Sequence, residues 1–496
     1  MWIVPLAFAA GAFLWAYIQL WSYIHDDVFI SVRYAKHLTE GLGLVYNPGE
    51  HVEGYTNFLY TTLLAIPLAL KLPIIPFIKL ANAIFVLLAA AATWLLARRT
   101  LLPEDRGPFL ALAPVVVFLL SVPVVISAAQ GLETMMFTLL LVLSVTLLFG
   151  EMRGNGFPWA AVCFAALAMT RPEGVTFALW AFLMGLLGRW PRRYMMWFAL
   201  VFFGLYGGYF VARLNYYRQW LPNTFYAKRG GGGILLHRGW KELIRDHGAS
   251  AWLLIPLAIA AARKRMAATM LIGVVLLRIA FQLWSGGPSS GRYRFLVPVL
   301  PFLYVLIVAG LTSLVRSSAA RRVAIGLAAL AILVPGWLAY PNEREYALAY
   351  GRGERRAHME FGRWVNTHTA GSAIIAMDDA GLGPLTADRE CIDMLGLNDS
   401  HIAHLSGSFG GKMDARYVLG RRPDLIVLIS TVPRATSGKD FELEGDAILF
   451  EDPEFGHLYR WCREYEFAPD YHLAVYRRID SKAVPPDSSV AIRPNR

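Results

Sequence analysis

Long apolar runs fill residues 1–340, and this pattern constrains the fold more than any other feature of the chain. A helix needs about 20 apolar residues to cross the hydrocarbon core of a bilayer. Inside lipid every backbone N–H and C=O group must be paired within the protein, so crossing segments of this length must be helices. Residues 1–340 are therefore predicted to form a polytopic α-helical membrane domain.

Eleven of the runs are predicted to cross the membrane. A further run, at residues 56–70, would place Arg98 and Arg99 on the wrong side if it crossed. We expect a short or re-entrant segment there, packed inside the protein, because lipid does not tolerate such a segment. The eleven crossings are expected near residues 3–23, 77–97, 108–127, 132–150, 157–170, 173–188, 195–213, 251–262, 266–284, 295–315 and 323–340.

Basic residues gather in short clusters between the apolar runs and set the predicted orientation. Short cytoplasmic loops collect Lys and Arg because positive charge resists translocation. With the clusters inside, we expect a cytoplasmic N-terminus, with the other loops and the C-terminal part on the outer side of the membrane. The net charge of +11 then reflects orientation, and we reject a nucleic-acid partner. The clusters are Arg98 and Arg99; Arg153; Arg189, Arg192 and Arg193; Arg263, Lys264 and Arg265; Arg316, Arg321 and Arg322.

Residues 341–484 have the composition of a water-facing protein, and we name them the C-terminal domain. Charged residues make up only 17% of the whole chain, against about 25% in an ordinary soluble protein. This deficit falls within the membrane domain. The change of composition near residue 340 predicts a domain boundary there, and residues 485–496 are predicted to be a disordered tail.

Short apolar runs in the C-terminal domain are typical of buried strands. Strands are predicted at residues 372–377 and 424–430, and an edge strand is predicted at 472–478. A helical pattern at residues 414–419 lies between them. Because strands and helices alternate, the domain is expected to be a small α/β layer.

Asp26 and Asp27 are adjacent carboxylates just past the first apolar run. Acidic side chains close to membrane-spanning segments are costly and mark functional sites by default. A carboxylate placed there can accept the proton of a hydroxyl nucleophile while a bond forms. Repulsion between the two can raise one pKa and leave the other group ionised. The sequence predicts a catalytic base at one of the two, with Asp26 placed before Asp27 although the sequence alone does not decide between them, and the structural alternative is a solvated helix cap.

The five predicted outer loops hold the remaining polar candidates. Carboxylates, guanidinium groups, amides and aromatic rings together suit a polar substrate with an anionic part, because Arg binds phosphate bidentately. Structural alternatives exist for several of them, such as a helix start, an anchor at the lipid headgroups or an ordered loop. The candidates for substrate binding are Arg33, Tyr34, Glu53, Tyr55, Asn57, Glu133, Arg171, Glu173, Asn223, Tyr226, Lys228, Arg292 and Arg294.

Several motifs occur in the order found in a group of GT-C membrane glycosyltransferases, and the chain resembles that group over most of residues 20–400. The group includes the mycobacterial terminal β-(1→2) arabinofuranosyltransferase of cell-wall arabinan and its bacterial relatives. The resembling segments are residues 26–35, 41–47 and 53–57 in the first outer loop, then residues 170–174, 221–228, 291–298 and 378–397.

The resemblance implies the GT-C fold, a location in the bacterial inner membrane with the C-terminal domain in the periplasm, and a sugar transfer on the outer face of that membrane. The donor would be a polyprenyl-phosphate sugar, with arabinofuranose favoured, and the acceptor a hydroxyl of a cell-envelope glycan. Asp26 or Asp27 matches the catalytic carboxylate of the group. Arg292 and Arg294 would stabilise the charge that develops on the lipid phosphate. No cofactor is firmly expected, and a divalent cation at the Asp pair stays open because some GT-C enzymes use one.

The C-terminal domain leaves two questions open. Asp378, Asp379 and Asp393 stand near predicted strand ends and could contact the acceptor glycan, although Asp at such positions more often makes a turn. Cys391 and Cys462 could form a disulfide in an oxidising compartment, which one sequence does not decide.

Other classes of protein are weighed against the enzyme. A lipid-linked sugar transporter would tend to have internal repeats or helices broken at mid-membrane, and the sequence has no repeat. An O-antigen ligase or polymerase usually relies on large loops between helices. A GT-C enzyme for a hexose or aminosugar, acting on lipopolysaccharide or protein, also remains open. Free polyprenyl phosphate after incubation would separate any of these enzymes from a transporter.

Overall fold

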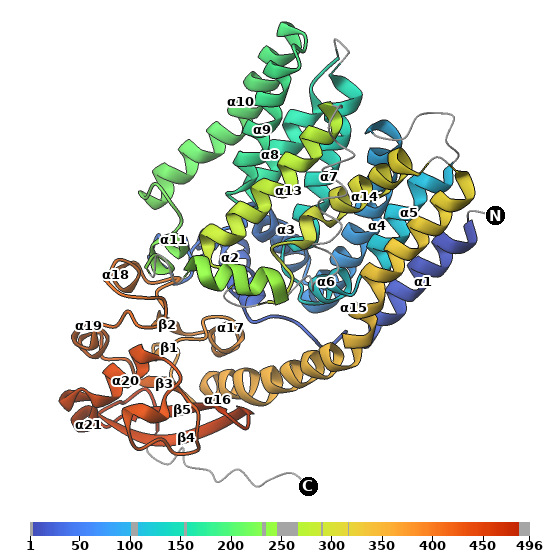
Figure 1. The fold of residues 1–496 in the computed structure, drawn as a ribbon. Helices are drawn as coiled ribbons and strands as arrows, with labels where there is room; N and C mark the ends of the chain where they lie inside the picture. The colour runs from blue at the N-terminus through green and yellow to red at the C-terminus, as the bar shows by residue number, and fades with distance from the viewer. Residues whose placement is uncertain are drawn as a thin grey trace.

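The computed structural model describes residues 3–100, 108–152, 156–230, 235–245, 266–288, 291–315 and 317–485. A bundle of apolar helices forms the membrane domain, and a small sheet with short helices forms the C-terminal domain at the other end of the molecule (Figure 1). Helix α15 (Ser318–Glu354) starts in the bundle and ends near the sheet (Figure 1). The boundary predicted near residue 340 therefore lies inside one continuous helix.

Six described helices are long and apolar enough to cross a bilayer, and a bent pair would make a seventh crossing. The two helices of the pair meet at an angle of 52°. Pro123 stands at the start of the second one and offers no backbone N–H to continue the first. The six are α4 (Ile74–Thr100), α7 (Thr134–Glu151), α10 (Arg192–Tyr217), α13 (Met266–Ser285), α15, and the segment that joins η1 (Val297–Val299) to α14 (Leu300–Leu314); the pair is α5 (Pro108–Leu120) and α6 (Val122–Ala129).

Shorter apolar helices account for the remaining described runs. They are α1 (Ile3–Gln19), α3 (Phe58–Ala69), α8 (Trp159–Thr170) and α9 (Gly174–Leu187). The crossing predicted at residues 251–262 lies outside the described residues. The total of eleven crossings thus stays a prediction.

Two short helices lie between the first two predicted crossings. Helix α2 (Asp27–Thr39) has 13 residues and α3 has 12. At 1.5 Å per residue they are about 20 Å and 18 Å long, which is short of the roughly 30 Å hydrocarbon core. A short segment at residues 56–70 agrees with the prediction. It is not enclosed on all sides, however, because Ile66 and Leu70 are exposed while Tyr60 and Leu64 are buried.

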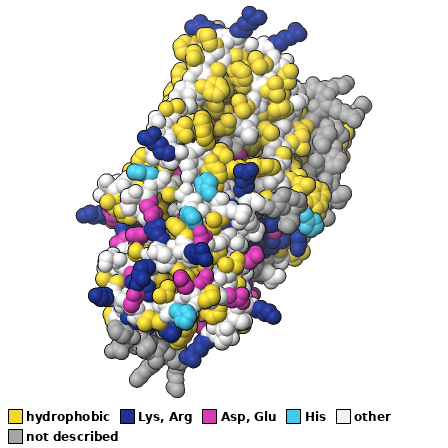
Figure 2. Space-filling model, turned by 90° about the vertical axis from the view of Figure 1, so that its left-hand side faces the viewer, with side chains coloured by type: hydrophobic (Ala, Val, Ile, Leu, Met, Phe, Trp, Pro, Cys, Tyr) yellow, Lys and Arg dark blue, Asp and Glu magenta, His cyan; other side chains and the backbone are white. Residues whose placement is uncertain are grey.

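The surface of the molecule changes character along its length. In Figure 2 apolar side chains cover the upper part of the visible face, whereas acidic side chains gather in its lower part. Lys and Arg side chains also mark the upper end. Large apolar side chains are exposed on the long helices, among them Leu200 and Phe203 of α10 and Leu327 and Leu338 of α15. An apolar belt of this kind fits a multi-pass membrane protein.

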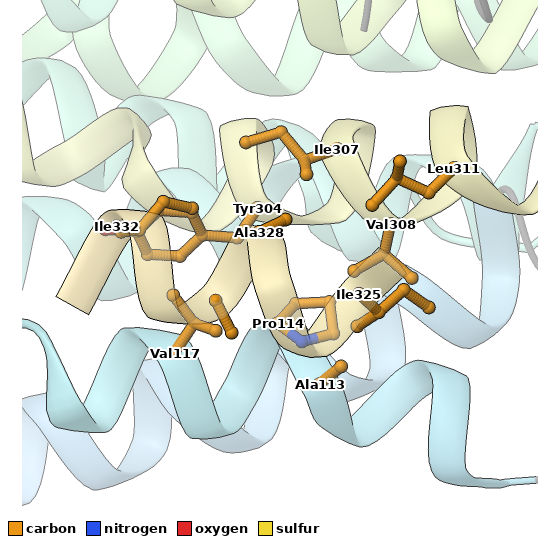
Figure 3. Close-up of a pocket in the computed structure, with 11 residues that line it drawn as sticks. Ala113, Pro114, Val117, Tyr304, Ile307, Val308, Leu311, Ile325, Ala328 and Ile332 are labelled. Atoms are coloured by element: carbon orange, nitrogen blue, oxygen red, sulfur yellow. The ribbon is translucent and has the colours of Figure 1, made fainter. Parts of the chain in front are cut away.

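A small apolar cavity of about 20 Å³ lies between α5, α14 and α15 (Figure 3). Val117, Ile307 and Ile332 are among the side chains around it. The hydroxyl of Tyr304, another lining residue, forms a hydrogen bond with Ser121 at 3.1 Å. Because a cavity of this size holds about one water and its walls are apolar, we treat it as a packing gap.

The C-terminal domain contains a five-stranded sheet in the order β2-β1-β3-β5-β4. Strand β1 pairs in parallel with β2 and β3, and β5 pairs antiparallel with β3 and β4. All six residues of β3 are buried, which places it at the centre of this core. The strands are β1 (Ile374–Met377), β2 (Glu390–Asp393), β3 (Leu425–Ser430), β4 (Tyr459–Ala468) and β5 (Tyr471–Arg478).

Short helices cover this sheet, so the predicted α/β layer is confirmed. The helix predicted at 414–419 is present as α19 (Ala415–Gly420). The prediction of an edge strand at 472–478 was wrong, because strand β4 pairs outside β5 and takes the edge. The other elements are η2 (Arg355–Met359), α16 (Glu360–His368), α17 (Leu382–Ala387), α18 (Ser400–Ala403), η3 (Gly438–Asp440), α20 (Glu444–Glu451) and α21 (Pro453–Leu458).

The cysteines of the C-terminal domain do not pair. Cys391 and Cys462 are both free. They lie on β2 and β4, the two opposite edges of the sheet. Four strand spacings of about 4.8 Å separate these edges, far beyond the reach of a disulfide.

Candidate active site

A cavity of about 770 Å³ lies where the membrane domain meets the C-terminal domain. It is lined by the start of α2, the first outer loop, the start of α9 and the end of α13. Two residues of the C-terminal domain also line it. Both aromatic and charged side chains face this space. The cavity is large enough for a drug-sized ligand.

Aromatic rings form a row along one wall. Phe225 stacks on Trp284 with ring centroids 6.3 Å apart, Trp284 lies 6.0 Å from Phe281, and Phe281 lies 5.6 Å from Phe295. Trp284 is 64% exposed at one end of the row. At the other end three guanidinium groups contact the ring of Phe295, those of Arg171, Arg278 and Arg294. The row thus joins an exposed apolar side chain to the charged part of the cavity.

Asp27 is the member of the acidic pair that reaches the cavity. It is the first residue of α2, and its side chain is 33% exposed. Nη1 of Arg294 lies 3.3 Å from its Oδ2. The backbone N–H of Asp27 donates to Nδ1 of His25 at 3.2 Å. The carboxylate is therefore oriented but still accessible.

Asp26 faces the C-terminal domain instead. It is 8% exposed, and its Oδ1 accepts a hydrogen bond from the backbone N–H of Leu382 at 2.7 Å. Its own backbone N–H donates to the Tyr350 hydroxyl at 3.2 Å. Burial raises the pKa of Asp26 to about 6. The two adjacent carboxylates, which the sequence did not distinguish, thus have different surroundings.

Cationic side chains outnumber acidic ones among the described residues that line the cavity. Arg294 is buried, and its Nε has no hydrogen-bond partner in the described part of the chain. Burial lowers the pKa of Lys228 to about 8. An excess of positive charge favours an anionic ligand. The cations are Arg171, Lys228, Arg229, Arg238 and Arg294, and the acids are Asp27, Glu133 and Glu173.

A chain of buried ion pairs supports the polar side of the cavity. Nδ2 of Asn57 donates to Glu133 at 3.0 Å, and Glu133 accepts from Arg171 at 2.5 Å. Arg171 also donates to Glu173 at 2.6 Å. Glu173 in turn accepts from Arg278 at 2.6 Å. Four predicted binding residues therefore form one network, and Arg278 completes it.

Arg278 was missed from the sequence, although a signal was present. It is a lone charged residue within the apolar run 266–284, and such residues are functional candidates by default. In the structure it is fully buried in α13. Leu397 and Phe409, which line the cavity from the C-terminal domain, had no comparable signal in the sequence.

Several predicted binding residues are not among the described cavity lining and instead hold the first outer loop in place. The Arg33 guanidinium donates to the carbonyls of Tyr46, Pro384 and Arg389. The Tyr34 hydroxyl accepts from the Gly54 N–H at 2.8 Å. These bonds give both side chains a structural role.

Glu53 and Tyr55 follow in the same loop and differ in position. Glu53 is buried in an ion pair with Arg213 at 2.5 Å, and burial raises its pKa to about 7 although Arg213 opposes the shift. Tyr55 does line the cavity, and its hydroxyl lies 3.0 Å from that of Tyr217. Asn57 lines it as well.

The predicted binding residues of the loop 221–228 are of two kinds: some hold the loop in place, and one lines the cavity. Asn223 donates to the carbonyls of Gly396, Leu397 and Asp399, so it ties its loop to the C-terminal domain. The ring of Tyr226 stacks on His404, with ring centroids 4.5 Å apart. Lys228, two residues later, does line the cavity.

The predicted pair Arg292 and Arg294 separates in the same way. Arg292 forms an ion pair with Glu343 and is not among the described lining residues. Arg294 lies in the cavity beside Asp27.

The acidic side chains of the C-terminal domain are mostly engaged within it. Asp393 accepts from the N–H groups of Leu395 and Asn398, the turn expected as the structural alternative. Asp378 is buried. Asp379 bonds to His358 at 2.7 Å. In the described residues no group of three His, Cys, Asp or Glu side chains is placed to hold a metal ion.

Three solved structures are similar to this chain along nearly its whole length. ArnT from Cupriavidus metallidurans bound to undecaprenyl phosphate has a TM-score of 0.59 at 14% identity, with 97% of this chain and 99% of that chain covered. The Archaeoglobus fulgidus oligosaccharyltransferase in its apo form has a TM-score of 0.62 at 11% identity, covering 94% and 80%. The arabinofuranosyltransferase AftD from Mycobacteria has a TM-score of 0.54 at 15% identity, covering 95% and 40%.

These similarities define the fold. The three proteins are GT-C glycosyltransferases, and this chain has the GT-C fold. A family described as "Domain of unknown function (DUF8728)" matches residues 344–491, which include most of the C-terminal domain. No curated protein matches the chain in sequence.

Proposed function

We propose that this protein is a membrane glycosyltransferase that transfers a sugar from a polyprenyl-phosphate donor to a hydroxyl group of a cell-envelope glycan on the outer membrane face. The observation that carries the proposal is the accessible Asp27 carboxylate beside Arg294 in a cavity rich in cations. A base and a phosphate site next to each other are what this reaction requires.

The aromatic row and the cations suit the two ends of the donor. The isoprenoid chain would lie along Trp284 and Phe281, starting where Trp284 is exposed. The phosphate would then meet Arg294 and Lys228. The buried Nε of Arg294 favours such a ligand, because an unpaired buried donor costs about 1–3 kcal/mol and a phosphate oxygen would satisfy it. Two similar structures contain lipid phosphates of this kind. The ArnT structure contains undecaprenyl phosphate, and a structure of the oligosaccharyltransferase AglB from Archaeoglobus fulgidus contains dolichol-phosphate.

Asp27 would act as the general base. It accepts the proton of the acceptor hydroxyl as the oxygen attacks the anomeric carbon, while the bond from that carbon to the phosphate oxygen breaks. Arg294 and Lys228 stabilise the negative charge that grows on the departing polyprenyl phosphate. The chemistry requires no redox partner.

The sugar would lie among the polar groups near Asp27. Ser31, Asn57 and Glu133 line this part, and the hydroxyl of Ser31 donates to Asn57 at 3.1 Å. Donors and acceptors of this kind select sugars through single hydroxyl contacts. We propose arabinofuranose as the sugar, in line with the resemblance of the first outer loop and with the arabinofuranosyltransferase among the similar structures.

The test uses the purified full-length protein in lipid nanodiscs, incubated with a panel of polyprenyl-phosphate sugars and envelope glycans. Product mass and released polyprenyl phosphate are measured, with Asp27→Asn as the control. Arabinose transfer supports the whole proposal, whereas hexose transfer alone refutes the choice of sugar. Movement of the lipid across the membrane with no release of polyprenyl phosphate would identify a transporter and overturn the proposal.

A further inference from the structure

A four-residue segment of the C-terminal domain is clasped against the beginning of α2. This segment, residues 379–382, connects β1 to α17, and we name it the strap. Leu382 donates its backbone N–H to Oδ1 of Asp26 at 2.7 Å, and the carbonyl of Ala380 accepts from the Tyr46 hydroxyl at 2.7 Å. The strap therefore bonds to the first outer loop at two points.

Gly381 brings the strap into close contact with Asp26. A Cβ atom at residue 381 would lie 2.3 Å from both the backbone oxygen and Oδ2 of Asp26. Real Cβ atoms do not approach other atoms this closely. Any larger residue at position 381 must push Asp26 or the strap aside.

His358 holds the other end of the strap. Its Nε2 lies 2.7 Å from Oδ2 of Asp379, and its Nδ1 lies 3.4 Å from Oε2 of Glu354. Because both nitrogens face carboxylates, the imidazole binds them best when doubly protonated. The side chain is 2% exposed, and the Tyr471 hydroxyl donates to the same Asp379 carboxylate at 2.5 Å. His358 also lies in η2, a π-helical turn, and such turns are frequent at functional sites.

Asp26, the residue that the strap contacts, directly precedes Asp27 in the chain. The Asp26 N–H donates to Tyr350, whose ring stacks on His25 with centroids 5.6 Å apart. His25 in turn accepts the N–H of Asp27. The carboxylate and backbone of Asp26 are thus both held, and the next side chain along the chain faces Arg294 in the cavity.

We propose that His358 is a positioning residue: by holding Asp379 it keeps the strap against Asp26, and this fixes the direction in which Asp27 faces the cavity. The inference deepens the proposed function, since its kinetic readout rests on transferase activity. It makes the C-terminal domain a working part of the active site.

The kinetic test compares His358→Gln with the wild-type protein. Because misplacing a reacting group by about 1 Å can cost up to 100-fold, we expect kcat to fall about tenfold or more. The donor KM should stay within about twofold, because Arg294 and Lys228 are unchanged. His401→Gln is the matched control: it also removes a His–Asp pair of the C-terminal domain, at 2.9 Å from Asp414. An unchanged kcat, or an equal loss in the control, overturns the proposal.

A second measurement does not depend on activity. Hydrogen exchange followed by mass spectrometry should show faster exchange in peptides covering residues 22–30 and 379–387 of His358→Gln, and no such change in His401→Gln. Gly381→Ala should also lower kcat and speed exchange in the same peptides, without removing a charge. Gly456→Ala, where an added Cβ meets nothing within 4 Å, should change neither kcat nor exchange. Unchanged exchange in both His358→Gln and Gly381→Ala overturns the proposal. If the wild-type protein transfers no sugar, the proposed function fails while exchange still tests the strap.

Discussion

Asp26 and Asp27 are neighbours in the chain, yet their carboxylates lie in two different surroundings, one buried and one accessible from the cavity. In the contact with the C-terminal domain, Asp26 is buried and accepts a hydrogen bond from Leu382. In the cavity, Asp27 keeps a third of its side chain accessible and has Arg294 at 3.3 Å. Successive residues of a helix point about 100° apart, so the two carboxylates at the start of α2 face different sides.

The cations divide in the same way. Arg33 and Arg292 have their guanidinium groups committed to carbonyls or to Glu343. Arg294 lines the cavity and retains a buried Nε without a partner in the described part of the chain. Arg33 and Arg292 therefore support the fold, whereas the buried Nε of Arg294, inside the cavity and unpaired among the described residues, makes this side chain a candidate for ligand binding.

Replacing each carboxylate by its amide is the most direct test of whether Asp26 and Asp27 have different roles. Asp27→Asn should lower kcat of transfer 100-fold or more, the usual scale for loss of a general base. Asp26→Asn keeps its shape, and its amide oxygen can still accept from Leu382, so the loss should be no more than about tenfold. Steady-state transfer assays in nanodiscs measure both. An equal loss in the two variants, or a larger one in Asp26→Asn, would contradict the division of roles.

The buried network offers the next largest effect, on stability. Glu173 bridges Arg171 and Arg278. Glu173→Gln leaves two buried guanidinium groups facing each other, and we expect the free energy of unfolding to fall by about 3 kcal/mol. Chemical denaturation in detergent measures this loss. Glu345→Gln, at an exposed position of α15, is the control and should change stability little; equal stability of the two variants would show that the network is not a support.

The same comparison can be made between two cations, Arg294 and Arg292, by measuring kcat/KM for the donor. Arg294→Ala should lower kcat/KM for the donor about 30-fold, because one contact to the developing phosphate charge is lost. Arg292→Ala should change it less than about threefold, since that side chain pairs with Glu343 outside the cavity lining. Donor titrations on both variants provide the measurement. A larger effect of Arg292→Ala would move the phosphate site away from Asp27.

The smallest expected effect is a pH dependence. The pKa of Lys228, lowered to about 8 by burial, means that the amine is charged below pH 8 and neutral above it. Its attraction for the donor phosphate is therefore present at pH 7 and lost at pH 9, and the donor KM should rise roughly fivefold over this range. Lys228→Arg should remove the dependence, because Arg stays charged. A donor KM independent of pH in the wild-type protein would exclude Lys228 as a phosphate contact.

Much of the architecture could be predicted from the sequence because it depends on patterns along the chain. Runs of about 20 apolar residues predict membrane helices whatever their neighbours are. The strands at 374–377 and 425–430 were predictable for a similar reason, since short apolar runs are buried in a sheet. Strand β4, in which buried, half-buried and exposed residues are mixed, has no such pattern, and the edge of the sheet was assigned to residues 472–478 as a result.

The sequence by itself also indicated where the reactive groups would gather, because the polar residues cluster in loops that were predicted to lie on one membrane face. Only the tertiary structure shows that, among the described residues, Asp27 and Arg294 line the cavity while Asp26 and Arg292 do not, and that Arg278, not Arg33, joins the buried network beside it. These differences depend on which side chains meet across segments up to about 350 residues apart, as Asp26 and Leu382 do. Hydrogen bonding and burial are set by such contacts in space, and no local pattern along the chain records them.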